Sequence, residues 1–214
     1  MTGGERLIVE PAHLALAQSL LETLEGQFGL GREERTVVAI AGESGSGKST
    51  SAMALAEVMA ARGIPAVVLH QDDYFIRPPR ANHAHRLDDL SSVGPHEVRL
   101  DLLAAHIADF RDGRDVPDAP RADHHTDSFV ARRLDLAAAS VLIVEGTYVL
   151  TLHDSDARIF LEATHEDTDE RRRLRNRDVD APIMGRILAI EHEIIALQAR
   201  RADILVDRHF AIHA

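Results

Sequence analysis

The sequence predicts an α/β protein in which a doubly wound, parallel sheet lies between two layers of helices, giving three layers in all. Short aliphatic segments that are apolar on both faces are typical of strands buried inside a parallel sheet. They alternate along the chain with longer segments of helical periodicity, the pattern of strands joined by crossover helices. The 214 residues suffice for one such unit and show no repeat or linker, so we expect a single domain over residues 1–214.

Each element can be assigned from its own pattern. The strand pattern occurs at residues 36–41, 65–70, 140–145, 157–162 and 202–207. Helices are expected between these strands, at residues 48–62, 95–111, 166–177 and 182–201, and a loop insertion at residues 75–94. Ahead of the first strand, leucines recur with roughly helical spacing after Pro11, a residue that suits a first helical turn. An N-terminal helix is therefore expected at about residues 11–28, packed outside the main sheet.

Composition excludes several classes of function. The chain has no cysteine, so it has neither a disulfide framework nor a thiolate metal site. Its formal net charge of −11 repels nucleic acid and anionic membranes at long range, and we expect neither as a partner. No apolar stretch has the length of a membrane span, and the first residues lack the pattern of a signal peptide, so a cytoplasmic location is expected.

The first predicted strand leads into a glycine-rich turn that contains the only lysine. Every one of the 24 Lys and Arg residues is arginine except Lys48. The turn, "GESGSGKS" at residues 42–49, matches the phosphate-loop pattern G-x-x-x-x-G-K-[ST] at every fixed position, between a strand and a helix. In such a loop, successive backbone N–H groups and a helix N-terminus surround an anion. A dinucleotide-binding turn is the alternative, but its third glycine is replaced by Thr50.

The loop therefore predicts binding of a nucleoside triphosphate. Lys48 supplies a compact charge on a flexible stem that reaches the β- and γ-phosphates, where a planar guanidinium would fit badly. Ser49 offers its hydroxyl to Mg²⁺. The residues expected to contact the nucleotide are Gly42, Ser44, Gly45, Ser46, Gly47, Lys48, Ser49 and Thr50.

Two further strands are followed by carboxylates. Asp72 and Asp73 come after the second strand, where one of them can orient an acceptor hydroxyl and take its proton during phosphoryl transfer. Glu145 comes at the end of a third strand, where a carboxylate holding Mg²⁺ is expected. Because the carboxyl ends of parallel strands meet at one edge of a sheet, these groups are expected beside the phosphate loop.

An arginine-rich segment follows the fourth strand. The stretch "DERRRLRNRD" at residues 169–178 is expected to form part of a helical lid at about residues 166–180. Arg173 and Arg177 lie four apart and can share one helix face, from which they would neutralise the triphosphate during transfer. The histidine pairs, such as His83 with His85, lack carboxylate or thiolate partners at recognised metal-ligand spacing, so we expect no metal there.

These motifs together resemble the uridine kinase and phosphoribulokinase family of phosphate-loop kinases. The matching stretches, from about residue 36 onward, are "GESGSGKST", "QDDYF", "VRLDLLAAHIADFRDGRDVP", "VLIVEGTYVL", "RRRLRNRD" and "ADILV". The resemblance implies that Asp72 contacts the acceptor hydroxyl and, with Lys48, is catalytic. It places the acceptor-binding region at about residues 72–133, where Tyr74, Arg77 and His124 are expected to contact the acceptor. It also implies ATP, or alternatively GTP, as the phosphate donor, and homo-oligomers occur in the family.

The sequence departs from uridine kinases where they hold the nucleoside. No aspartate stands at Val93, ahead of the run Gly94–Val98, and no aromatic residue follows Pro117. Uridine or cytidine is the leading named acceptor, with a sugar, a sugar phosphate or a pantothenate-like alcohol as the alternatives. Arg77, Arg80 and Arg86 in the expected insertion would suit an anionic acceptor. A nucleotide switch or ATPase module is the alternative of another class, although the N-K-x-D motif of GTPases is absent.

Overall fold

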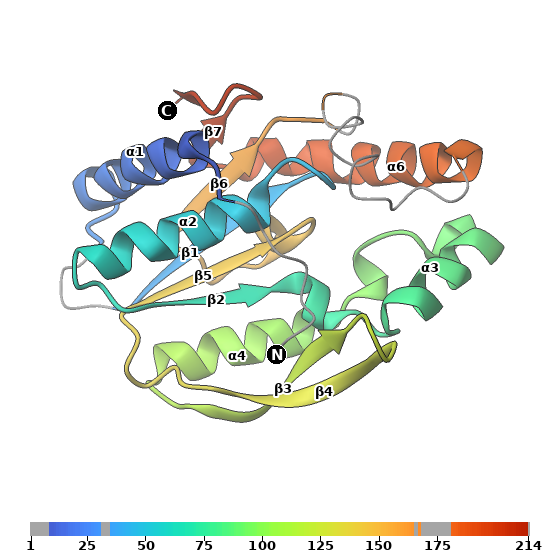
Figure 1. Ribbon diagram of the computed structural model, residues 1–214, viewed down its shortest axis with the longest axis horizontal. Helices are drawn as coiled ribbons and strands as arrows, with labels where there is room; N and C mark the ends of the chain where they lie inside the picture. The colour runs from blue at the N-terminus through green and yellow to red at the C-terminus, as the bar shows by residue number, and fades with distance from the viewer. Residues whose placement is uncertain (1–8, 31–34, 165–166, 168–180, 214) are drawn as a thin grey trace.

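The sheet confirms the predicted doubly wound α/β fold. A computed structural model describes residues 9–30, 35–164, 167 and 181–213, without the side chains of 181 and 182. Its six-stranded sheet has the order β2-β5-β1-β6-β7-β8 (Figure 1). The parallel strands are β1 (Thr36–Gly42), β2 (Ala66–His70), β5 (Val141–Gly146), β6 (Ala157–Leu161) and β7 (Ile204–Val206). β8 (Ile212–His213) is antiparallel to β7.

Alternate side chains of the central strand β1 point to opposite faces of the sheet, so the core has two halves. β1 is buried along its whole length. Val37 and Ala39 face a core formed with α4 (Leu100–Arg111), whereas Val38 and Ile40 face one formed with α1 (Pro11–Gln27) and α2 (Lys48–Ala61). Figure 1 shows α1 and α2 on one side of the sheet and α4 on the other. The N-terminal helix thus lies where its leucine pattern predicts.

A helix and a two-stranded hairpin differ from the prediction. A helix, α3 (Pro79–Asp88), occupies part of the expected loop insertion, and an antiparallel hairpin, β3 (Val116–Asp123) and β4 (Ser128–Leu134), was not predicted. α3 is polar and lacks an apolar face of its own, so periodicity cannot reveal it. β3 contains two prolines, which are unfavourable in a central strand but tolerated in this two-stranded hairpin.

The remaining helices agree with the prediction in type but differ in extent. The helix expected from residue 95 begins at Leu100, after the short 3₁₀ turn η3 (Pro95–Glu97). The last long helix, α6 (Ala181–Ala196), continues into the 3₁₀ helix η5 (Leu197–Arg201). Of the expected lid at residues 166–180, only Asp167 is described, so Arg173 and Arg177 lie outside the described residues. Across the described chain, no helix combines the length and apolarity of a membrane span.

Candidate active site

Strand register brings three motifs to one edge of the sheet. β1 pairs with β5 so that Ala41 lies opposite Gly146, and β2 pairs with β5 so that His70 lies opposite Glu145. The segments after β1, β2 and β5 therefore leave the sheet side by side. They are the glycine-rich loop, the segment that carries Asp72, and Glu145 with the residues that follow it. Neighbouring parallel strands of similar length end at the same edge of the sheet, so the segments that follow them must lie side by side.

The glycine-rich loop has the backbone geometry of an anion-binding turn. Gly45 and Gly47 have φ of 85° and 94°, in the left-handed region that strongly favours glycine, and α2 begins immediately afterwards at Lys48. The Ser46 N–H donates to the Glu43 carbonyl at 3.1 Å, and Lys48 Nζ donates to the same carbonyl at 3.4 Å, which closes the turn. The loop thus offers backbone N–H groups, a helix N-terminus and one cation at a single place.

Glu145 and Ser49 provide oxygen ligands of the kind that Mg²⁺ prefers. The Glu145 carboxylate is buried, and its Oε1 lies 2.7 Å from His70 Nδ1. Burial alone would raise the pKa of Glu145, but the His70 hydrogen bond, the Lys48 charge and the Ser49 hydroxyl together lower it. Oε2 has no hydrogen-bond partner among the described residues. An ionised, buried oxygen beside the Ser49 hydroxyl fits the predicted magnesium site, so the two predicted ligands lie together.

The two aspartates after β2 have different environments. They lie in the 3₁₀ helix η1 (Gln71–Tyr74). Asp73 is buried, and its two oxygens accept from the Ala122 N–H at 2.9 Å and from Arg132 at 3.2 Å, which attaches η1 to the β3–β4 hairpin. Asp72 is exposed, and its charge acts on the neighbouring His70. Asp73 therefore has a structural role in holding the hairpin, whereas Asp72 lies at the surface of the site.

Gln71 fixes η1 to the end of β5, a role that sequence analysis missed. Its side chain donates to Thr147 Oγ1 at 2.9 Å and accepts from the Tyr148 N–H at 2.7 Å. Gly146 makes this possible, because a Cβ there would lie 2.3 Å from the Gln71 Cβ. The signal was present in the stretches "QDDYF" and "VEGTY", but the two can be paired only when their strands are known to be neighbours.

The residues expected to contact the acceptor are dispersed. Tyr74 is fully buried and its hydroxyl lies 2.7 Å from His106 Nδ1, so the structure corrects its assignment from acceptor contact to core residue. His124 is exposed in the turn between β3 and β4, and Arg77 is half-buried before α3. Arg86, considered above for an anionic acceptor, is instead held by Glu97 and Glu191.

The fold and this loop define a phosphate-loop protein of the α/β class. The chain belongs to the phosphoribulokinase / uridine kinase family, whose model matches residues 37–181. It is 30% identical over 195 residues to a bifunctional alpha-galactosidase/sucrose kinase of Mediterraneibacter gnavus, covering 85% of this chain but only 21% of that protein. It is 27% identical over 186 residues to a uridine kinase of Staphylococcus epidermidis, covering 81% of this chain and 87% of the relative.

Solved structures show the same fold. A protein described as a possible uridine kinase from Bacillus stearothermophilus superposes with a TM-score of 0.64 at 20% identity, covering 89% of this chain and 97% of the other. A protein described as a fructose transport system kinase from Silicibacter superposes with a TM-score of 0.60 at 24% identity, covering 88% and 92%. At these identities the superpositions support the fold, while family membership shows a kinase that acts on small alcohols.

Proposed function

We propose that the protein transfers the γ-phosphate of ATP to a hydroxyl group of a small metabolite, with Mg²⁺ as the cofactor and Asp72 as the residue that orients the acceptor. The observation that carries the proposal is the meeting of the phosphate loop, the Ser49–Glu145 oxygens and the exposed Asp72 at one edge of the sheet. GTP is the alternative donor. The chain lacks the N-K-x-D motif with which GTPases read guanine.

In the proposed reaction, the acceptor oxygen forms a bond to the γ-phosphorus while the bond between that phosphorus and the β–γ bridging oxygen breaks. The hydroxyl proton passes to Asp72, and ADP leaves with the bridging oxygen. Lys48 and the N–H groups of the loop stabilise charge on the phosphates, which matters more than a strong base in a loose transition state. Ser49 and Glu145 would hold Mg²⁺, which would supply further charge neutralisation on the triphosphate.

The lid assignment rests on the sequence alone. Arg173 and Arg177 remain the residues proposed to close over the triphosphate, and both lie outside the described residues. The candidate acceptors include both sugars and nucleosides, because the relatives include a sucrose kinase and uridine kinases. Uridine, cytidine, a sugar, a sugar phosphate and a pantothenate-like alcohol are all candidates.

The test is acceptor-dependent formation of ADP from ATP and Mg²⁺, with a panel that covers these candidates. Asp72→Asn should lower kcat by about 10²–10⁴-fold, the range for loss of a general base, while leaving ATP affinity within about twofold. Asp73→Asn is the matched control, and it should lower thermal stability more than Asp72→Asn does, because Asp73 holds the hairpin. Tight ATP binding without any acceptor-dependent ADP would contradict the proposal and favour the nucleotide-switch alternative.

A further inference from the structure

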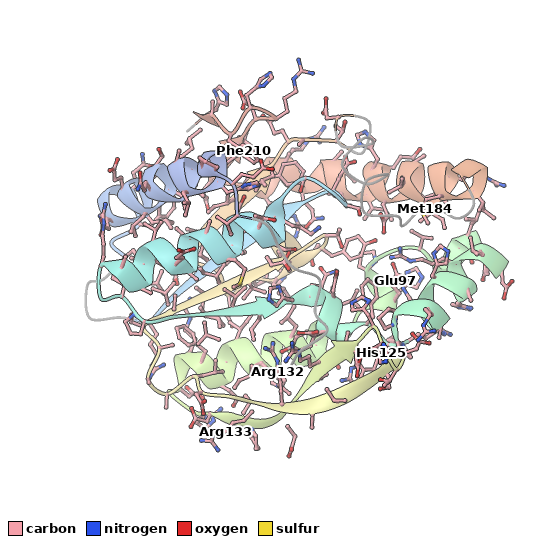
Figure 2. All side chains as sticks on the ribbon, viewed as in Figure 1. Glu97, His125, Arg132, Arg133, Met184 and Phe210 are labelled. Carbon is pink, nitrogen blue, oxygen red and sulfur yellow. The ribbon has the colours of Figure 1, made fainter. Side chains whose placement is uncertain are left out.

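A buried polar cluster lies near Asp72 and takes no part in the proposed reaction. Its members come from four parts of the fold: Asn82 and Arg86 of α3, Glu97 of η3, Tyr148 after β5 and Glu191 of α6. Figure 2 shows Glu97 between α3 and α6. Asp72 acts on the pKa of both Tyr148 and Glu191, and Lys48 acts on that of Glu191. The cluster therefore lies near enough to Asp72 and Lys48 for their charges to act on it.

The one cation of the cluster is fully engaged by carboxylates. Arg86 donates to both oxygens of Glu97, at 2.7 and 2.6 Å, and lies 3.0 Å from Glu191 Oε1. Its guanidinium also lies over the Phe75 ring, at 5.5 Å from the centroid. Two carboxyl groups therefore contact this one guanidinium. Among the described members of the cluster, none offers an unused positive charge to a phosphate or carboxylate group.

Two polar atoms of the cluster lack hydrogen-bond partners among the described residues. They are the Tyr148 hydroxyl and Asn82 Oδ1, and both residues are buried. Burial raises the pKa of Tyr148, and the Glu191 and Glu97 carboxyls raise it further, so the phenol stays neutral and can both donate and accept. Burial also raises the pKa of Glu191, despite Arg86, so this carboxyl keeps its proton to a higher pH than an ordinary glutamate.

We propose that this cluster binds the non-reacting hydroxyls of the acceptor and restricts the acceptor to uncharged, polyhydroxylated compounds, that is, sugars or sugar alcohols. The inference rests on the proposed kinase function. A sugar hydroxyl can donate to Asn82 Oδ1 or a carboxylate and accept from Tyr148, whereas an anionic acceptor would meet the Asp72 and Glu97 carboxylates without an unused cation to compensate for them. Because Tyr148 is fully buried in this structure, the proposal requires the residues that cover its hydroxyl to move when the acceptor binds.

A purely structural cluster, which only fastens α3 to α6, is the competing explanation. The two explanations can be distinguished by comparing the two tyrosines of the chain, because both side chains are fully buried. The Tyr74 hydroxyl is hydrogen-bonded to His106, whereas the Tyr148 hydroxyl has no partner among the described residues. Replacing each by phenylalanine removes one oxygen and keeps the ring.

Tyr148→Phe should raise the acceptor KM at least tenfold, leave the KM for ATP within twofold and leave the melting temperature unchanged or higher. Tyr74→Phe should lower the melting temperature and leave the acceptor KM within twofold. Steady-state kinetics and thermal melts of the purified chain check both. An acceptor KM that does not respond to Tyr148→Phe would overturn the assignment, as would a lowered melting temperature with unchanged KM, the result that a structural cluster predicts.

The acceptor class is tested with matched pairs: a sugar against its monophosphate, glycerol against glycerate, and a nucleoside against its ribose. Uncharged sugars or polyols should exceed their anionic counterparts at least 100-fold in kcat/KM. Preference for an anionic acceptor, or for a nucleoside over every sugar, would overturn the inference while leaving the kinase assignment intact. Absence of turnover with every compound would overturn both.

Discussion

At the scale of single residues, the site depends on contacts that orient its functional groups. His70 holds one oxygen of Glu145, and Gln71 holds the backbone after β5. The pKa of His70 is raised, since the hydrogen bond to Glu145 and the nearby carboxylates outweigh the effect of burial, so the contact with Glu145 favours the charged imidazole. Residues of this kind fix the direction of a metal ligand without touching the substrate.

Gly146 tests this positioning directly. Gly146→Ala would place a Cβ 2.3 Å from the Gln71 Cβ, so η1 has to move away from β5. We expect a loss of about 1–3 kcal/mol of stability, as for other overpacked sites. Because Asp72 follows Gln71, kcat should fall as well, while ATP affinity should change little. Thermal melts and acceptor-dependent ADP formation measure the two effects; Gly26→Ala, at an open position near the end of α1, is the control.

At the scale of elements, the sequence patterns identified the strands that are buried on both faces. They missed the elements that are held by contacts with residues distant in the sequence. The strands and α2 follow from runs of apolar or small residues, and the phosphate loop follows from its fixed spacing. Helix α3 is held instead by Asn82 and Arg86 on Glu97, contacts that no local pattern reveals. In the site, Glu145 and Ser49 were predicted from strand ends and the loop motif. The roles of Gln71 and Asp73 required knowledge of strand order and of the hairpin.

The contact between η1 and α4 predicts a pH dependence of stability. Burial lowers the pKa of His106, and its Nδ1 lies 2.7 Å from the Tyr74 hydroxyl. Because the folded pKa lies below the ordinary value of 6.5, the stability that His106 contributes is present above that pH and is lost as the pH falls through the folded pKa.

His106→Gln can still accept from Tyr74 but does not titrate. The melting temperature of the native chain should therefore fall more steeply than that of His106→Gln between about pH 7 and pH 5, where histidine changes charge. Parallel slopes over this range would contradict the assignment of a neutral, buried His106. Both proteins contain the same carboxylates, so their contribution cancels when the two slopes of melting temperature against pH are compared.

At the scale of the whole molecule, α6 links the two sides of the site. His192 Nδ1 lies 2.6 Å from the Glu43 carboxylate in the phosphate loop, and Glu191 contacts Arg86 of α3. Adjacent residues of one helix thus reach the nucleotide side and the acceptor side. Movement of α6 would alter both contacts together, so nucleotide binding and acceptor access are expected to be coupled through this helix.

The N-terminal helix is expected to be essential although it lies outside the family match, which begins at residue 37. Leu16, Leu20, Leu21 and Leu24 are at most 2% exposed and belong to the core shared with α2. Each such leucine contributes about 1.5–3 kcal/mol on burial, so the four together contribute roughly 6–12 kcal/mol. That sum is comparable with the whole stability of a typical domain, about 5–15 kcal/mol.

A chain lacking residues 1–30 should therefore lack a cooperative thermal transition and bind no ATP. α1 also reaches the phosphate loop itself, since the His13 ring lies against Phe210 and a Cβ added at Gly47 would lie within 4 Å of both. Circular dichroism melts and ATP titration compare this truncation with one that removes only residues 1–8 and keeps α1 whole. If the chain that lacks residues 1–30 showed a cooperative transition and native ATP affinity, the rest of the domain would fold without α1. That result would contradict the prediction.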